Sequence, residues 1–90
     1  MQNIALLALY TIRHGKICTP STGSIPANTT EEAKIECMKS PECVHLFDKV
    51  GNFRDFSYCR DGEDVTLQTM SRGNAILYTK TEFGKIQNHY

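Results

Sequence analysis

The hydrophobic and polar positions just before residue 40 follow the period of an amphipathic helix. Glu32, Glu36 and Lys39 recur at i, i+4 and i+7 and form one polar stripe. The rest of the arc is occupied by Ala33, Ile35, Cys37 and Met38. This pattern predicts one helix over about residues 30–40 that lies with its apolar side on the core.

Both ends of this helix are marked in the sequence. Thr29 and Glu32 have the spacing of a capping box, in which the two side chains bind free backbone N–H groups of the first turn. At the other end Pro41 follows Ser40, and a proline disfavours helical geometry in the residue before it. We therefore expect the helix to end close to Ser40.

Short extended runs, each bounded by Gly, Asn or Asp, occupy most of the remaining chain. A first strand ends near Cys18, a polar surface loop covers residues 19–28, and the later runs cover residues 43–50, 53–60, 65–70 and 75–79. The turn residues between the later runs, Gly51-Asn52, Asp61-Gly62 and Arg72-Gly73-Asn74, are of the kind that joins antiparallel neighbours. The predicted fold class is α+β, with a single helix packed on an antiparallel sheet of about five strands.

The length of 90 residues suits one domain with one core. We expect a single domain over residues 1–90, with its core at about 10–80 and a frayed tail at 81–90. The longest apolar run, residues 4–10 (IALLALY), is either a buried first strand or the remnant of a signal sequence, and it is too short to span a bilayer. The expected core side chains are Leu46, Phe47, Phe56, Tyr58, Ile76, Leu77 and Tyr78.

The charge balance removes two classes of partner. Ten Lys and Arg residues stand against ten Asp and Glu residues, so the formal net charge is zero. Binding to nucleic acid or to an anionic membrane surface usually relies on a strong basic field. We therefore expect no nucleic-acid partner and no membrane insertion.

The four cysteines predict a disulfide-stabilised protein. An even number of cysteines in a short chain is typical of two disulfides formed in an oxidising compartment. Cys37 lies in the last turn of the helix and Cys43 opens the next strand, close enough for a bridge, which leaves Cys18 to pair with Cys59. No C-x2-C pair is present, so a structural zinc site is not favoured and no metal or cofactor is expected.

The sequence offers no catalytic constellation. His14, His45 and His89 each lack a neighbouring acidic residue that would orient them as a general base. We therefore predict no catalytic residues and no enzymatic activity.

Four segments together resemble the PAN/apple domain family. They are Gly15-Lys16-Ile17-Cys18, residues 31–47 (EEAKIECMKSPECVHLF), Phe56-Ser57-Tyr58-Cys59 and residues 76–80 (ILYTK). The family combines a helix ending in cysteine, a turn with a second cysteine, and later strands in this order. Ala33 stands where many members carry a helix cysteine, and no terminal cysteine pair is present, so the chain is similar to a four-cysteine variant.

The resemblance implies a function without catalysis. PAN/apple domains are extracellular recognition modules that bind proteins or carbohydrates, usually as one part of a longer chain. A secreted protein that binds an extracellular protein or glycan is therefore expected. Two alternatives stay open from the residues alone: a secreted small inhibitor or toxin-like effector, and an intracellular metal-binding or interaction domain with free thiols.

Two surface features are candidates for modification and binding. Asn28-Thr29-Thr30 is an N-glycosylation sequon in a polar segment, which makes Asn28 a candidate glycosylation site. Lys49, Asn52, Phe53 and Arg54 are the candidate ligand contacts, because Phe and Arg at a hairpin tip are typical recognition residues. The simpler alternative for the basic residues is surface charge paired with the interleaved acids Asp48, Asp55, Asp61, Glu63 and Asp64.

Overall fold

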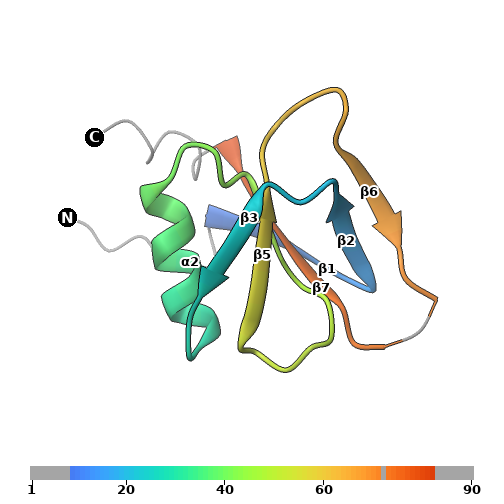
Figure 1. Ribbon diagram of the computed structural model, residues 1–90, viewed down its shortest axis with the longest axis horizontal. Coiled ribbons are helices and arrows are strands. Elements are labelled where there is room, and N and C mark those ends of the chain that lie inside the picture. The colour runs from blue at the N-terminus through green and yellow to red at the C-terminus, as the bar shows by residue number, and fades with distance from the viewer. Residues whose placement is uncertain (1–8, 72, 83–90) are drawn as a thin grey trace.

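The computed structural model describes residues 9–71 and 73–82. The elements in this part of the chain are β1 (Tyr10–His14), β2 (Lys16–Thr19), β3 (Gly23–Pro26), α2 (Thr30–Lys39), β4 (His45–Asp48), β5 (Asp55–Cys59), β6 (Thr66–Thr69) and β7 (Ile76–Lys80) (Figure 1). The positions 4–8 of the apolar run, most of the expected tail and His89 lie outside the described residues.

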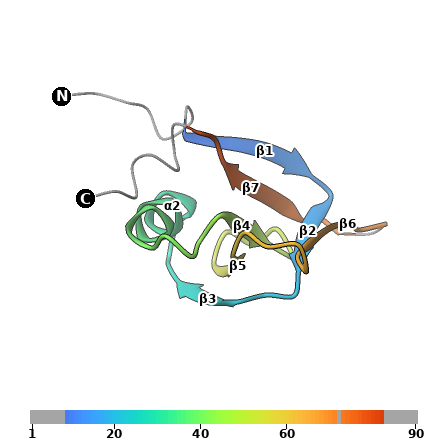
Figure 2. The same cartoon turned by 90° about the horizontal axis from the view of Figure 1, so that it is seen from above.

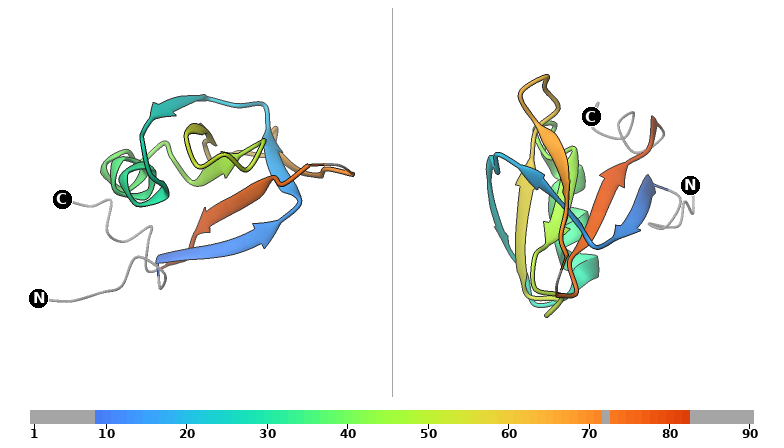
Figure 3. Two further views of the ribbon diagram at one scale, coloured as in Figure 1. Left: turned by 90° about the horizontal axis from the view of Figure 1, so that it is seen from below. Right: turned by 90° about the vertical axis from the view of Figure 1, so that its right-hand side faces the viewer.

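One helix packs on a five-stranded sheet in the order β1-β7-β4-β5-β3, and every neighbouring pair is antiparallel. The sheet curves around α2, which lies against its concave face (Figure 2). The strands β2 and β6 form a separate two-stranded ribbon on the side away from the helix (Figure 3). Over the residues that the structure describes, the predicted α+β class, with one helix on an antiparallel sheet of about five strands, is confirmed.

The segment expected as one first strand is divided at Gly15. This glycine has a φ of 75°, a left-handed conformation in which a glycine carries no side-chain penalty. Its N–H donates to the carbonyl of Ala75, and its own carbonyl accepts from the N–H of Met70. The chain thus turns a corner at Gly15, so β1 joins the large sheet and β2 joins the ribbon.

The loop expected at residues 19–28 contains the edge strand β3. Ile25 is buried and stands opposite Phe56 of β5 in the antiparallel register. The prolines and small polar residues around Ile25 favour a loop when the segment is considered alone. Pairing with β5 in the folded protein stabilises a strand there instead. The expectation of an irregular loop over this whole segment was wrong.

Only one of the three predicted turns joins neighbouring strands. The turn at Gly51-Asn52 connects the paired strands β4 and β5. The connection through Asp61-Gly62 instead leads out of the sheet to β6, and the connection through Gly73 leads back to β7, which lies between β1 and β4. All four residues of β6 are exposed, so this strand has no apolar face to bury in the large sheet.

The sheet buries side chains on both faces, so the described residues form two hydrophobic clusters where one was expected. In β4, Leu46 belongs to the cluster under the helix and Phe47 to the cluster under the ribbon. Tyr78 and Leu77 of β7 divide in the same way, because successive residues of a strand point to opposite faces. Tyr58 and Ile76, also expected in the core, are partly buried and pack against the cluster under the helix.

The helix begins with the predicted Thr29 cap, but the side chain of Glu32 binds the N–H of the residue before the cap instead of that of Thr29. Thr29 accepts the N–H of Glu32 at 3.1 Å, and the Glu32 carboxylate accepts the N–H of Asn28 at 2.8 Å. The apolar side differs from the prediction, since Ile35 is 46% exposed and Lys34 is buried. The Lys34 ammonium lies 5.0 Å from the ring centroid of Tyr78, which offers it a favourable cation–π contact.

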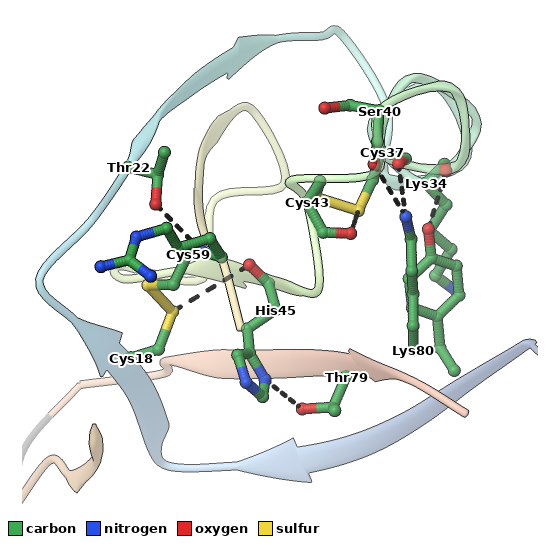
Figure 4. Close-up of a disulfide and its surroundings, with 12 residues drawn as sticks. Cys18, Thr22, Lys34, Cys37, Ser40, Cys43, His45, Cys59, Thr79 and Lys80 are labelled. Carbon is green, nitrogen blue, oxygen red and sulfur yellow. Dashed lines mark hydrogen bonds between the residues drawn. A yellow bond between two sulfur atoms is a disulfide. The ribbon is translucent and has the colours of Figure 1, made fainter. Parts of the chain in front are cut away.

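Two disulfides connect the layers, as the cysteine spacing predicted (Figure 4). Cys37 and Cys43 bridge the end of α2 to the segment that leads into β4, with Cα atoms 5.2 Å apart. Cys18 and Cys59 bridge the ribbon strand β2 to β5, with Cα atoms 6.3 Å apart. All four cysteine residues are fully buried.

Candidate functional site

The connection between β4 and β5, residues 49–54, contains all four predicted ligand contacts, and we call it the 49–54 loop. Asp48, the last residue of β4, is fully buried and lies beneath it. One oxygen of its carboxylate accepts the N–H groups of Gly51 at 2.9 Å and Asn52 at 3.3 Å. The other accepts the N–H of Phe53 at 2.7 Å. Hydrogen bonds to an ionised acceptor are among the stronger ones in proteins, so Asp48 fixes the loop backbone.

The side chain of Asn52 completes this arrangement. Its oxygen accepts the N–H groups of Arg54 and Asp55, both at 3.0 Å. Its amide nitrogen donates to the carboxylate of Asp55. Five consecutive backbone N–H groups, from residue 51 to residue 55, therefore bind either Asp48 or Asn52.

Phe53 has a backbone conformation that is uncommon for its residue type. Its φ of 60° makes it the one non-glycine with positive φ among the described residues. A left-handed conformation is unfavourable by roughly 1 to 2 kcal/mol for a residue with a Cβ atom. The hydrogen bond from the Phe53 N–H to the buried Asp48 carboxylate helps to hold it there. Backbone strain of this kind is found preferentially at functional positions.

The loop presents apolar and cationic side chains to solvent. Val50 is 56% exposed and Phe53 is 51% exposed, the two largest values among the exposed large hydrophobic residues of the described chain. Lys49 and Arg54 are also exposed, and neither forms an ion pair within the described ranges. An aromatic anchor beside cations is a common composition of binding surfaces.

The loop is also fixed from the side by the connection between β6 and β7. Gly51 has a φ of 73°, and a Cβ atom placed on it would lie only 2.5 Å from the carbonyl oxygen and the Cβ of Asn74. No side chain fits there without movement of the Asn74 backbone. Gly51 thus permits close contact between the two connections.

The simpler alternative, that the basic and acidic residues are paired surface charges, holds for only some of these residues. The guanidinium of Arg60 binds both oxygens of Asp64 at 2.8 Å, as that interpretation expects. Asp48 contradicts it, because this residue is buried and its carboxylate accepts backbone N–H groups. Asp48 was expected to be one of the surface charges. In the structure its buried carboxylate lies beneath the 49–54 loop and binds the backbone of that loop.

The remaining candidates lie apart from the loop. Asn28 is exposed directly before α2, which leaves its side chain accessible. His14 is exposed at the end of β1, and the Nδ1 atom of His45 lies 2.9 Å from the hydroxyl of Thr79 (Figure 4). In the described part of the chain no three His, Cys, Asp or Glu residues are grouped as a metal site would require. No helix in that part is long and apolar enough to cross a membrane.

Sequence reasoning missed two residues of this site. Val50 was counted as part of a strand, although its position directly before Gly51-Asn52 placed it in the turn. Asp48 carried a weaker signal, since an aspartate three residues before a glycine is well placed to accept N–H groups of a turn.

Comparisons with known proteins give no further assignment. The chain matches no protein-family model, and neither the curated proteins nor the solved structures contain a match. The resemblance to PAN/apple domains therefore stays a prediction drawn from the residues themselves.

Proposed function

We propose that this protein is an extracellular, non-catalytic recognition module that binds a protein or a glycan through the 49–54 loop. The observation that carries this proposal is the half-exposed Phe53, held in a strained backbone conformation by the fully buried Asp48. A loop fixed before binding loses little conformational entropy when a partner arrives, so more of the contact energy appears as affinity.

The roles of the loop residues follow from their contacts. Phe53 and Val50 are the apolar anchors, because they are the most exposed of the large hydrophobic residues in the described part of the chain. Lys49 and Arg54 supply cationic hydrogen-bond donors, which suit carboxylate or sulfate groups of an acidic partner. Asn52 is a positioning residue, since both ends of its carboxamide bind within the loop.

The extracellular location is supported by the covalent chemistry of the chain. Two buried disulfides are typical of proteins from oxidising compartments. The exposed sequon at Asn28 would accept a glycan in such a compartment. A resemblance to PAN/apple domains points in the same direction.

A binding screen with matched variants tests the proposal. The oxidised protein is applied to arrays of glycans and of extracellular proteins, and every hit is repeated with Phe53→Ala and with the control Ile12→Ala. Ile12 is an exposed hydrophobic residue of β1, outside the loop. We expect Phe53→Ala to weaken binding by about tenfold or more and Ile12→Ala to leave it unchanged.

Two outcomes would overturn the proposal. The first is a partner that binds Phe53→Ala as tightly as the wild type, which would place recognition elsewhere. The second is the detection of free thiols when the protein, produced by export from the cell, is denatured and titrated without a reducing agent. Free thiols would favour the intracellular alternative.

A further inference from the structure

A groove between α2 and the edge strand β3 forms a second concave surface, on the sheet edge farthest from β1. It encloses about 610 Å³. Its lining comes from three elements and the residue that ends the helix: Ser24, Ile25 and Pro26 of β3, Glu32, Ile35 and Glu36 of α2, Tyr58 of β5, and Ser40. Figures 1 and 2 show that β3 and α2 are neighbouring elements.

The two walls of the groove differ in chemistry. The sheet wall is apolar and aromatic, with Pro26 and Tyr58 beside the buried Ile25. The helix wall carries Glu32 and Glu36 on either side of the half-exposed Ile35. No Lys or Arg lines the groove, so it is locally acidic although the whole chain has no net charge.

The charges on the helix wall are open to a competing cation. Glu36 pairs with Lys39 at 3.2 Å, but both side chains are more than half exposed. An exposed pair of this kind contributes little free energy, so a ligand cation can replace Lys39. Glu32 binds the N–H of Asn28 through one oxygen, which leaves the other oxygen for a ligand.

The spacing of the two glutamates matches that of an extended peptide. Glu32 and Glu36 are four residues apart on a helix, which separates them by about 6 Å along its axis. Alternate residues of an extended chain point to the same side and are about 6.6 Å apart. Two cations at alternate positions can therefore face both glutamates, while the residue between them points to the opposite wall at Tyr58.

Side chains, more than backbone pairing, would hold such a peptide. The edge strand β3 is only four residues long and ends in Pro26, which has no N–H to donate. Short edge strands that contain proline are protected against continued sheet pairing.

We propose that this groove binds an extended cationic peptide segment of a partner protein, with the pattern cation–apolar–cation. The two cations bind Glu32 and Glu36, and the apolar side chain between them packs on Tyr58 and Pro26. The groove carries acidic side chains and the 49–54 loop carries basic ones, so this is a second site with a ligand of opposite charge. It adjoins a smaller hollow that Arg54 of the loop lines together with β3.

The test uses the full oxidised chain, labelled with ¹⁵N, and the probe acetyl-Arg-Leu-Arg-amide. We expect saturable chemical-shift changes concentrated at Ser24, Ile35 and Ser40. The isomer acetyl-Arg-Arg-Leu-amide has the same charge with adjacent cations, and acetyl-Glu-Leu-Glu-amide has the reversed charge. Both should bind more weakly, because neither can face both glutamates with cations.

Matched charge reversals on one helix make the test specific. Glu36→Lys should weaken binding of the probe by about five- to tenfold, whereas Glu31→Lys, which changes an exposed residue outside the groove, should not. Phe53→Ala should bind the probe as the wild type does. Equal weakening by both lysine variants, equal binding of the two arginine isomers, or shifts centred on the 49–54 loop would each overturn the proposal.

Discussion

At the scale of single residues, Asp48 is the residue on which the candidate recognition site depends. A carboxylate that is fully buried is tolerated only where hydrogen bonds compensate for its lost hydration. Here three backbone N–H groups of the 49–54 loop supply that compensation. The same bonds hold the exposed Phe53 in its left-handed conformation, so the stability of the fold and the proposed recognition role depend on one side chain.

Replacement of Asp48 by asparagine should therefore lower the stability of the fold and loosen the 49–54 loop. Asp48→Asn keeps the shape but presents an NH2 group to N–H donors, and we expect the free energy of unfolding to fall by about 2 to 3 kcal/mol. Urea unfolding measures the loss, and hydrogen exchange at the amides of Gly51 and Phe53 should accelerate more than elsewhere. Asp61→Asn, at an exposed position, serves as the control and should change little. An equal effect of both variants would contradict this role.

The left-handed conformation of Phe53 leads to a second prediction, about the relative stability of the glycine and alanine variants at this position. At a positive φ, Phe53→Gly should be more stable than Phe53→Ala by about 1 kcal/mol, the reverse of the usual order in regular structure. The pair Arg54→Gly and Arg54→Ala is the control, because Arg54 has no positive φ. Urea unfolding of all four variants checks the prediction, and a more stable alanine variant at both positions would refute the left-handed assignment.

At the scale of elements, α2 shows what a local sequence pattern can predict. Its start was predictable because Thr29 and Glu32, which cap it, lie within the first turn. Its end close to Ser40 was also predicted, from Pro41, and the structure confirms it. The contact that satisfies this end was not predicted: the Lys80 ammonium donates to the carbonyls of Cys37 at 2.8 Å and Ser40 at 3.0 Å (Figure 4). Lys80 comes from β7, 40 residues after Ser40, so no pattern near the helix could indicate it.

Distance in the sequence between paired segments also explains why the strand predictions missed β3 and the ribbon of β2 and β6. β3 depends on a partner strand, β5, that lies beyond the helix, and the ribbon pairs β2 with the distant β6. The four predicted ligand contacts, Lys49, Asn52, Phe53 and Arg54, are close in sequence, so their common place in the connection between β4 and β5 depends on no distant part of the chain. The sequence did not reveal that Asp48 is buried beneath this turn, because burial depends on how the whole chain folds.

Lys80 gives a prediction about pH. Burial lowers the pKa of this ammonium from 10.5 to about 8. Between these values the unfolded chain keeps a proton that the folded chain has lost, so the free energy of unfolding should rise with pH from about 8 to 10. We expect a rise of roughly 1 to 2 kcal/mol. Above pH 10 the effect reverses, because burial raises the pKa of Tyr10 and Tyr78.

Urea unfolding at several pH values from 7 to 10 measures the rise. The variant Lys80→Met removes the titrating group while it keeps most of the apolar length of the side chain. Its stability should be nearly constant over this range. A rise of the same size in Lys80→Met would assign the effect to another group.

At the scale of the whole molecule, the two disulfides act on different layers. The bridge between Cys37 and Cys43 closes a short loop between the end of α2 and the segment that leads into β4, with a sequence separation of 6. The bridge between Cys18 and Cys59 spans a separation of 41 and ties the ribbon to the sheet. The ribbon strand β6 is exposed along its length and carries no cysteine, so the bridge reaches the ribbon through Cys18 of its other strand, β2.

The double variants should therefore differ in stability. In a chain-entropy treatment, removal of the bridge at Cys18 and Cys59 lowers the free energy of unfolding by about 3.9 kcal/mol, and removal of the bridge at Cys37 and Cys43 by about 2.4 kcal/mol. Urea unfolding of Cys18→Ala with Cys59→Ala, and of Cys37→Ala with Cys43→Ala, compares them. A larger loss in the second pair would show that contacts in the helix layer outweigh loop length.

The pairing of β1 with β7 has a practical consequence for protein engineering. The N–H of Thr81 binds the carbonyl of Leu9 at 2.8 Å, so the two ends of the described range 9–82 lie side by side. The 49–54 loop follows β4 at the opposite end of these strands, where Asp48 stands beside Ile76. The domain can therefore be grafted into a surface turn of a host protein through two adjacent junctions, with the Phe53 tip directed away from the host.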